Sequence, residues 1–170
     1  MPNVKHYVIT SITLGLIAAS SAGLIGLANY LTAEKIKKNE QEKITSGIRA
    51  IFGENASIER EEDLSSFKYA NHLYVMKDNE GLAFRVTGSN MYGKISLIVG
   101  FSGSNFDFRG MYMVTDEQTY ASTLEDNYIA TVNKGERDID DVSCGATYGA
   151  TLVKDMINDA KNAALELNKD

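Results

Sequence analysis

The sequence contains few of the residues that build metal sites and disulfide frameworks. Its 170 residues include one cysteine, two histidines, one proline and no tryptophan. A single cysteine excludes a disulfide framework and any cysteine-rich zinc or iron–sulfur site within the chain. The histidines, His6 and His72, are far apart, and neither a second histidine nor a cysteine lies near His72. We therefore expect no metal site and no catalytic triad.

Positive charge is also scarce. The chain has 17 Lys plus Arg against 23 Asp plus Glu, which gives a formal net charge of -6. Without a basic stripe, this balance argues against nucleic acid as a partner. The length itself predicts one folded domain.

Charge is absent altogether from residues 7–31. A helix of that length reaches roughly 37 Å, enough to cross about 30 Å of hydrocarbon with some tilt. We therefore interpret residues 1–31 as an N-terminal transmembrane helix. A cleaved signal peptide remains an alternative, with Gly26-Leu27-Ala28 as its exit, although the apolar run is longer than such peptides need. A lipoprotein would require a cysteine at the end of this segment, and the only cysteine is Cys144.

Small residues share one face of this predicted helix, at steps of three and four. They are Ser11, Gly15, Ala19, Ala22, Gly23 and Gly26. Such spacing lets a second helix approach closely within lipid, so we expect packing against other membrane subunits. Lys35, Lys37, Lys38 and Lys43 follow the helix, which by the positive-inside rule favours a cytoplasmic C-terminal part.

The remaining sequence changes from helical to alternating patterns. Residues 32–53 read as a juxtamembrane helix ending at Gly53, and residues 54–63 as an acidic connector before the rest of a 54–170 domain. Strands are predicted at 72–77, 81–87, 92–101 and 107–114, with turns at 78–81 and 102–105. An amphipathic helix is predicted at 151–167, with a core face of Leu152, Val153, Met156, Ile157, Ala160, Ala163, Ala164 and Leu167. This order predicts an α+β fold with an antiparallel meander.

Two glycine-containing segments were considered as phosphate sites. Residues 88–94 (GSNMYGK) resemble the start of a P-loop, but Ile95 stands where Ser or Thr is needed and a strand follows instead of a helix, so we reject it. Residues 138–151 (DIDDVSCGATYGAT) lead into the last helix. Free N–H groups at a helix start suit a phosphate, and Gly145 permits close approach of the backbone.

Residues 141–147 (DVSCGAT) resemble the flavinylation motif of the FMN-binding domain family, Asp-x-x-(Ser/Thr)-Gly-Ala-Thr. The resemblance implies that Thr147 carries FMN through a phosphoester bond, attached by a dedicated flavin transferase. Asp141, Gly145 and Ala146 match the motif, whereas Cys144 stands where Ser or Thr is usual. Thr151 ends a second Gly-Ala-Thr but lacks the preceding Asp, and Gly149 stands where many members have Thr or Ser.

The resemblance extends along the chain to the G subunit of the Rnf complex. An uncharged N-terminal span, Asn29-Tyr30-Leu31-Thr32-Ala33, a charged helix and the strand region around residues 92–100 are similar to that family. A family loop of Glu-Thr-Pro-Gly, which touches the isoalloxazine, has its nearest match at residues 117–120 (EQTY). Thr119 in that loop and Tyr148 beside the acceptor therefore join the expected FMN-binding residues. The C subunit of the sodium-translocating NADH:quinone reductase is a related alternative.

The resemblance implies a fold, a place and a function. The fold is a curved antiparallel sheet packed by helices, and the place is the extracytoplasmic face of the cell membrane, contrary to the lysine pattern. The function is that of a non-catalytic redox subunit, a phosphoprotein that relays electrons within an ion-translocating ferredoxin:NAD oxidoreductase. Alternatives are a membrane-anchored FMN-binding or sensory module and a free-standing extracytoplasmic flavoprotein.

Overall fold

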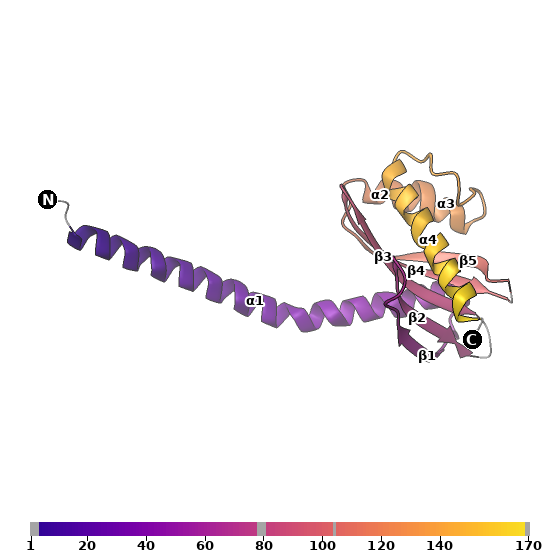
Figure 1. Ribbon diagram of the computed structural model, residues 1–170, viewed down its shortest axis with the longest axis horizontal. Coiled ribbons are helices and arrows are strands. Elements are labelled where there is room, and N and C mark those ends of the chain that lie inside the picture. Colours follow the sequence, from indigo (N-terminus) through magenta and orange to yellow (C-terminus); the bar gives the residue numbers. More distant parts are fainter. Residues whose placement is uncertain (1–3, 78–80, 104, 169–170) are drawn as a thin grey trace. The chain divides into compact units, whose positions relative to one another are not determined.

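The computed structural model describes residues 4–77, 81–103 and 105–168. The chain divides into two compact units, residues 1–42 and 43–170, which are described separately here. Helix α1 (Val4–Phe52) begins in the first unit and ends in the second (Figure 1). The helices predicted at 1–31 and 32–53 are therefore one continuous element.

The described part of the first unit is the N-terminal part of α1, in which an exposed apolar stretch precedes a charged one. Among the described residues, α1 is the one helix long and apolar enough to cross a membrane, and none of its most apolar stretch is buried. The hydroxyl groups in this stretch donate to carbonyl oxygens within the helix at 2.8–2.9 Å, at Thr10, Thr13, Ser20, Ser21 and Thr32. Such bonds satisfy polar groups that lipid would leave unpaired.

The second unit is built on one five-stranded antiparallel sheet in the order β1-β2-β3-β4-β5. Its strands are β1 (Ile58–Asp63), β2 (Ala70–Met76), β3 (Leu82–Asn90), β4 (Gly93–Ser102) and β5 (Asp107–Asp116). The predicted meander is confirmed. Register shifts in three of the four strand pairs mark bulges, which bend and twist a sheet. In the predicted turns, residues 78–80 and 104 lie outside the described residues.

Strand β1 corrects the sequence interpretation, which assigned residues 54–63 to a connector. Its residues IEREED carry five charges, and most of them are exposed. Strand patterns based on apolar alternation cannot detect such a segment, because β1 is an edge strand and needs little burial. His72 of β2 is the pairing partner of Asp63 in β1, and its Nδ1 lies 2.6 Å from Asp63 Oδ1.

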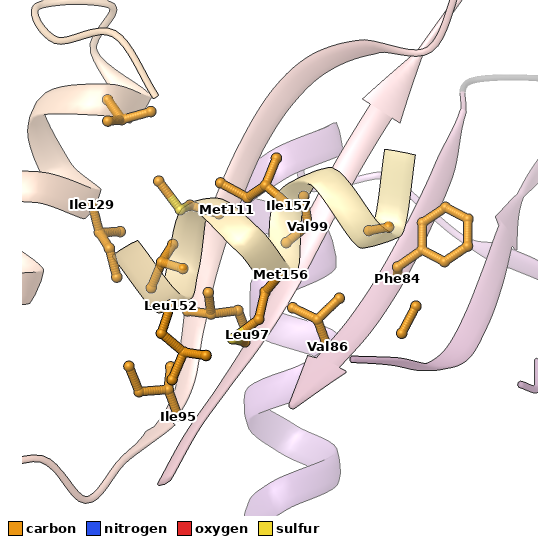
Figure 2. Packing of buried hydrophobic residues seen from close by; sticks show 14 of the residues in the cluster. Phe84, Val86, Ile95, Leu97, Val99, Met111, Ile129, Leu152, Met156 and Ile157 are labelled. Atoms are coloured by element: carbon orange, nitrogen blue, oxygen red, sulfur yellow. The ribbon is translucent and has the colours of Figure 1, made fainter. Parts of the chain in front are cut away.

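A hydrophobic core on one face of the sheet joins it to α4 (Thr147–Leu167). Leu152, Met156 and Ile157 of α4 lie among buried residues such as Leu97 and Val99 from the sheet, as Figure 2 shows. Seven of the eight residues predicted for the core face of this helix are buried, and Leu167 is the exception. The helix begins at residue 147, four residues before the prediction.

A second core lies on the other face of the sheet. Here Ile44, Ile48 and Phe52, at the end of α1, pack with residues including Ile98 and Val114. Strand β4 is thus covered on both faces, which explains its almost continuous apolar sequence.

The end of α1 is fixed by specific contacts. Gly53 has a φ of +108°, and its N–H donates to Arg49 O, so the helix stops at the residue that the sequence predicted. Arg109 of β5 donates to the last carbonyl groups, from Nε to Ile51 O at 3.0 Å and from its guanidinium to Phe52 O at 3.3 Å.

A short helical segment connects β5 to the loop before α4. It comprises α2 (Ala121–Leu124), a π-helical turn η2 (Glu125–Ile129) and α3 (Ala130–Asn133). The side chain of Asn133 bonds both the N–H and the C=O of Met111, at 2.9 and 2.8 Å, and so occupies hydrogen-bonding groups of the β5 edge.

Candidate functional site

A pocket of about 270 Å³ lies where α4 begins. Eight residues line it: Tyr92, Gln118, Tyr120, Gly145, Ala146, Thr147, Tyr148 and Gly149. They come from the β3–β4 turn, the segment between β5 and α2, and the loop that leads into α4. Small-molecule sites typically enclose roughly 300–1,000 Å³, so this volume suits part of a ligand while the rest stays exposed.

The predicted site residues divide into those that line this pocket and those that do not. Gly145, Ala146, Thr147 and Tyr148 line it. Asp141, Cys144 and Thr119 do not, although the neighbours of Thr119, Gln118 and Tyr120, are lining residues. The pocket therefore brings together four of the seven predicted site residues.

The start of α4 presents main-chain donors beside an exposed threonine. Ala146 is the N-cap, and the N–H of Ala150 donates to Ala146 O at 3.0 Å, which closes the first turn. The N–H groups before residue 150 therefore have no partner within the helix. Thr147 is the first helical residue, and it is exposed. Gly145 enters this turn with a φ of +87°, a conformation that favours glycine.

Asp141 organises the loop before the pocket. Its Oδ2 lies 2.8 Å from a guanidinium nitrogen of Arg137, and its Oδ1 accepts the N–H of Ser143 at 3.2 Å. The same Arg137 nitrogen donates to the carbonyl oxygens of Asp141 and Ser143. Asp141 thus holds the shape of the loop that precedes Thr147.

Further contacts tie this loop to the helices around it. Lys154 of α4 lies 3.0 Å from Asp140, and Asn127 of η2 donates to the carbonyl oxygen of Cys144 at 3.3 Å. The buried Tyr128 donates its hydroxyl to Ile139 O at 2.5 Å, and burial raises the pKa of this phenol far above its usual value of 10. Cys144 is itself buried, so it supports the loop from the core side.

Three tyrosines surround the pocket. The ring of Tyr92 lies 6.2 Å from that of Tyr120 and 5.6 Å from that of Tyr148, measured between centroids. Tyr120 and Tyr148 are 54% and 62% exposed. Aromatic faces and edges that are open to solvent are suited to hold a planar ring system.

Polar hydrogen bonds connect the walls of the pocket. Asn90 Nδ2 donates to Tyr148 O at 3.2 Å, while Asn90 Oδ1 accepts the N–H of Tyr92 and Nε2 of Gln118, both at 2.8 Å. Neither Asn90 nor Gln118 was predicted as a site residue. The only sequence signal for Gln118 was its place in the loop at residues 117–120.

The chemistry of the lining is that of a binding pocket. Of its eight residues, only the three tyrosines carry a titratable side chain, and no carboxylate, imidazole or amine is among them. The described parts of the chain also contain no group of three or more His, Cys, Asp or Glu residues placed to hold a metal ion. A threonine hydroxyl needs a base to react, and the lining offers none that would activate Thr147.

Comparison with known families adds evidence for the N-terminal part. Residues 1–50 match the family model described as the RnfG N-terminal region. The resemblance to the G subunit of the Rnf complex is therefore confirmed over these residues, and the match supports an Rnf-type membrane subunit. No curated protein matches the chain. The matched segment ends within α1, so it does not include the pocket.

Proposed function

We propose that this chain is the flavin-carrying subunit of an Rnf-type membrane complex, with FMN bound through a phosphoester to Thr147. One observation carries the proposal. Within the flavinylation-like motif, Thr147 is exposed at the first turn of a helix and lines a pocket bordered by three tyrosines. The match of residues 1–50 supports the membrane complex as its setting.

The start of α4 fits the phosphate of FMN. A phosphodiester keeps one negative charge, which unpaired N–H groups and the positive end of the helix dipole stabilise. A covalent tether also makes a cluster of basic side chains unnecessary, because it keeps the local flavin concentration high whatever the intrinsic affinity. The lining residues are uncharged, in keeping with such a ligand.

The tyrosines fit the ring system. Tyr92, Tyr120 and Tyr148 would contact the isoalloxazine, and the open pocket would leave part of it accessible to electron-transfer partners. When bound, the flavin supplies the redox chemistry. The chain supplies position, hydrogen bonds and local polarity.

Attachment requires a separate enzyme, since the pocket lacks a base. In that step the Thr147 oxygen forms a bond to the flavin phosphate, while the hydroxyl proton and the leaving group of an activated flavin donor depart. The exposure of Thr147 gives a transferase access to the hydroxyl. We place the flavin domain outside the cytoplasm, where a tether prevents loss of a cofactor that could not be replaced from a cytosolic pool. The small-residue face of α1 would contact the other membrane subunits.

The acceptor is tested by comparing Thr147→Ala with Thr151→Ala. Both threonines are exposed in the first turns of α4, so the substitutions are matched in burial and helical context. Each variant is coexpressed with a flavin transferase, and flavin fluorescence is read from a denaturing gel. We expect Thr147→Ala to abolish the fluorescent band and Thr151→Ala to retain it.

Equal protein amounts and unchanged melting temperatures serve as controls for folding. A fluorescent band that persists in Thr147→Ala would contradict the proposed attachment. Copurification of the wild-type chain with several membrane subunits would support its place in a complex, whereas a flavin-loaded chain that is always monomeric would oppose it.

A further inference from the structure

Gln118 combines deep burial with a position on the pocket wall. The residue is 9% exposed, and it is one of the eight that line the pocket. Its Nε2 donates to Asn90 Oδ1 at 2.8 Å and to Gly93 O at 3.3 Å. Among the described residues, none donates a hydrogen bond to its Oε1. Oε1 is not among the buried side-chain atoms that lack a hydrogen-bond partner, so it keeps an open surface and can accept a hydrogen bond from a ligand in the pocket.

The orientation of this carboxamide is fixed by its neighbours. Asn90 must direct Nδ2 to Tyr148 O and Oδ1 to the N–H of Tyr92. The side of Asn90 that faces Gln118 is therefore an oxygen, and Gln118 must present Nε2 to it. Rotating the Gln118 carboxamide by half a turn would place Oε1 against two acceptor oxygens, so Oε1 remains on the opposite side.

That opposite side meets the first turn of α4 at Gly149. A Cβ on Gly149 would lie 2.7 Å from Gln118 Oε1 and 3.0 Å from Leu124 Cδ2. The absence of a side chain at residue 149 is what admits Gln118 to the pocket.

We propose that Gln118 Oε1 accepts a hydrogen bond from the bound flavin, either from an N–H of the ring or from a ribityl hydroxyl. Gln118 is then a cofactor-binding residue. Asn90 is a positioning residue that acts through Gln118, and Gly149 provides the space. The assignment of the ligand rests on the proposed function, while the acceptor itself rests on the contacts of Gln118.

The test measures reversible binding, which does not depend on the tether. The full chain is produced in detergent without a flavin transferase, and it is titrated with riboflavin and with lumichrome, which lacks the ribityl chain. Gln118→Met keeps the length of the side chain and removes the acceptor. We expect its riboflavin Kd to rise about three- to tenfold, as for the loss of one neutral hydrogen bond. Ser122→Ala, at an exposed position of α2 outside the pocket lining, should leave Kd unchanged.

The two probes identify the donor. An equal loss of affinity for riboflavin and lumichrome in Gln118→Met indicates a ring N–H, and a loss confined to riboflavin indicates a ribityl hydroxyl. Either result supports the proposal. Unchanged affinity for both probes, in a variant that melts at the wild-type temperature, would overturn it.

Two further variants keep the proposal testable if Gln118→Met folds poorly. Asn90→Ala should weaken riboflavin binding, and its effect should not add to that of Gln118→Met, because both act on one contact. Gly149→Ala should also weaken binding, although alanine favours the helix more than glycine does. Additive losses, or tighter binding in Gly149→Ala, would contradict the arrangement.

The tether and the acceptor can fail independently. Intact mass of the chain coexpressed with a transferase reports attachment at Thr147, whereas the titrations report the role of Gln118. Reversible binding that depends on Gln118 in a chain never loaded covalently would refute the tether alone. Covalent loading combined with wild-type affinity in Gln118→Met would refute the acceptor alone.

Discussion

Two glycines allow the pocket-lining segments to approach one another. At Gly93, where φ is +138°, a Cβ would lie 2.4 Å from Glu117 O, so the β3–β4 turn can touch the segment after β5 only without a side chain. At Gly149 a Cβ would meet Gln118. Single residues thus determine whether three distant parts of the sequence form one pocket.

Asp116 is hydrogen-bonded to the main chain of Gln118, and titration of its carboxyl group makes the stability of the fold depend on pH. Its Oδ1 accepts the N–H of Gln118 at 2.8 Å, while its Oδ2 is buried without a hydrogen-bond partner. Burial raises the pKa of Asp116 above its ordinary value of 3.8, and the bond from Gln118 only partly opposes this. The folded state therefore retains the proton more strongly than the unfolded state. The free energy of unfolding should therefore fall as the pH rises from the pKa of Asp116 in the unfolded state through its higher pKa in the folded state.

We predict that Asp116→Asn removes this pH-dependent loss. The amide keeps an acceptor for the Gln118 N–H and carries no charge to desolvate, so the variant should be more stable than wild type above that pH window. Melting temperatures of the full chain between pH 4 and 7 provide the measurement. Asp107→Asn, at an exposed position at the other end of β5, makes the same change in charge and is the control. A wild-type pH profile in Asp116→Asn would refute this account.

At the scale of elements, α4 both carries Thr147, the proposed acceptor, and covers the sheet. Its C-terminal half is attached to β2 through Asp159, whose carboxylate accepts the N–H groups of Tyr69 and Ala70 at 2.7 and 2.9 Å. These two N–H groups lie at the beginning of β2, the strand next to the edge strand β1. The contact therefore fixes the helix along its length as well as at the pocket.

We predict that Asp159→Ala lowers the free energy of unfolding by about 1–3 kcal/mol, because two main-chain donors lose a charged acceptor. Chemical unfolding of the full chain in detergent, monitored by circular dichroism, gives the value. Asn158→Ala, on the exposed side of the same helix, should change stability far less. Equal effects of the two substitutions would show that the link to β2 is unimportant.

How far the sequence predicted these elements depends on their burial. The strands that became β2–β5 and the core face of α4 could be predicted because apolar residues recur with the period of the element. Strand β1 could not, since an exposed edge strand is recognised by its pairing and not by its own residues. The first turn of α4 was missed because Thr147, Gly149 and Thr151 are weak helix formers that depend on tertiary contacts.

The candidate site was predictable only where a local motif exists. Residues 145–148 are contiguous and were found, and they do line the pocket. Tyr92, Gln118 and Tyr120 reach it through the pairing of β3, β4 and β5, which no short motif encodes. Thr119 was also expected at the site, but it is exposed in a turn and does not line the pocket, whereas its two neighbours do.

On the scale of the whole molecule, the chain combines a membrane-type helix with a separate folded unit. Different observations support the roles of the helix and of the folded unit. Residues 1–50 match the RnfG N-terminal region, whereas the flavin site proposed in residues 43–170 rests on the pocket at the start of α4. The proposed electron relay would require both, because a tethered flavin would have to be held near partners in the membrane.

We predict that residues 43–170 lie outside the cytoplasm. Protease added to intact spheroplasts should remove this part of the chain, while a cytoplasmic marker protein remains whole. Alkaline carbonate washing should leave the chain in the membrane fraction, since α1 is long and apolar enough to cross the bilayer. Protection from the protease until the cells are lysed would reverse the orientation and agree with the lysines that follow the apolar stretch.

The central claim is the bond between Thr147 and a flavin phosphate, and mass spectrometry tests it most directly. The full chain, purified from membranes of cells that contain a flavin transferase, is weighed intact and then mapped by proteolysis. The account predicts a mass increase of one FMN minus one water, located on the peptide that contains Thr147. A peptide with the mass of its amino acids alone, from fully folded protein, would contradict it.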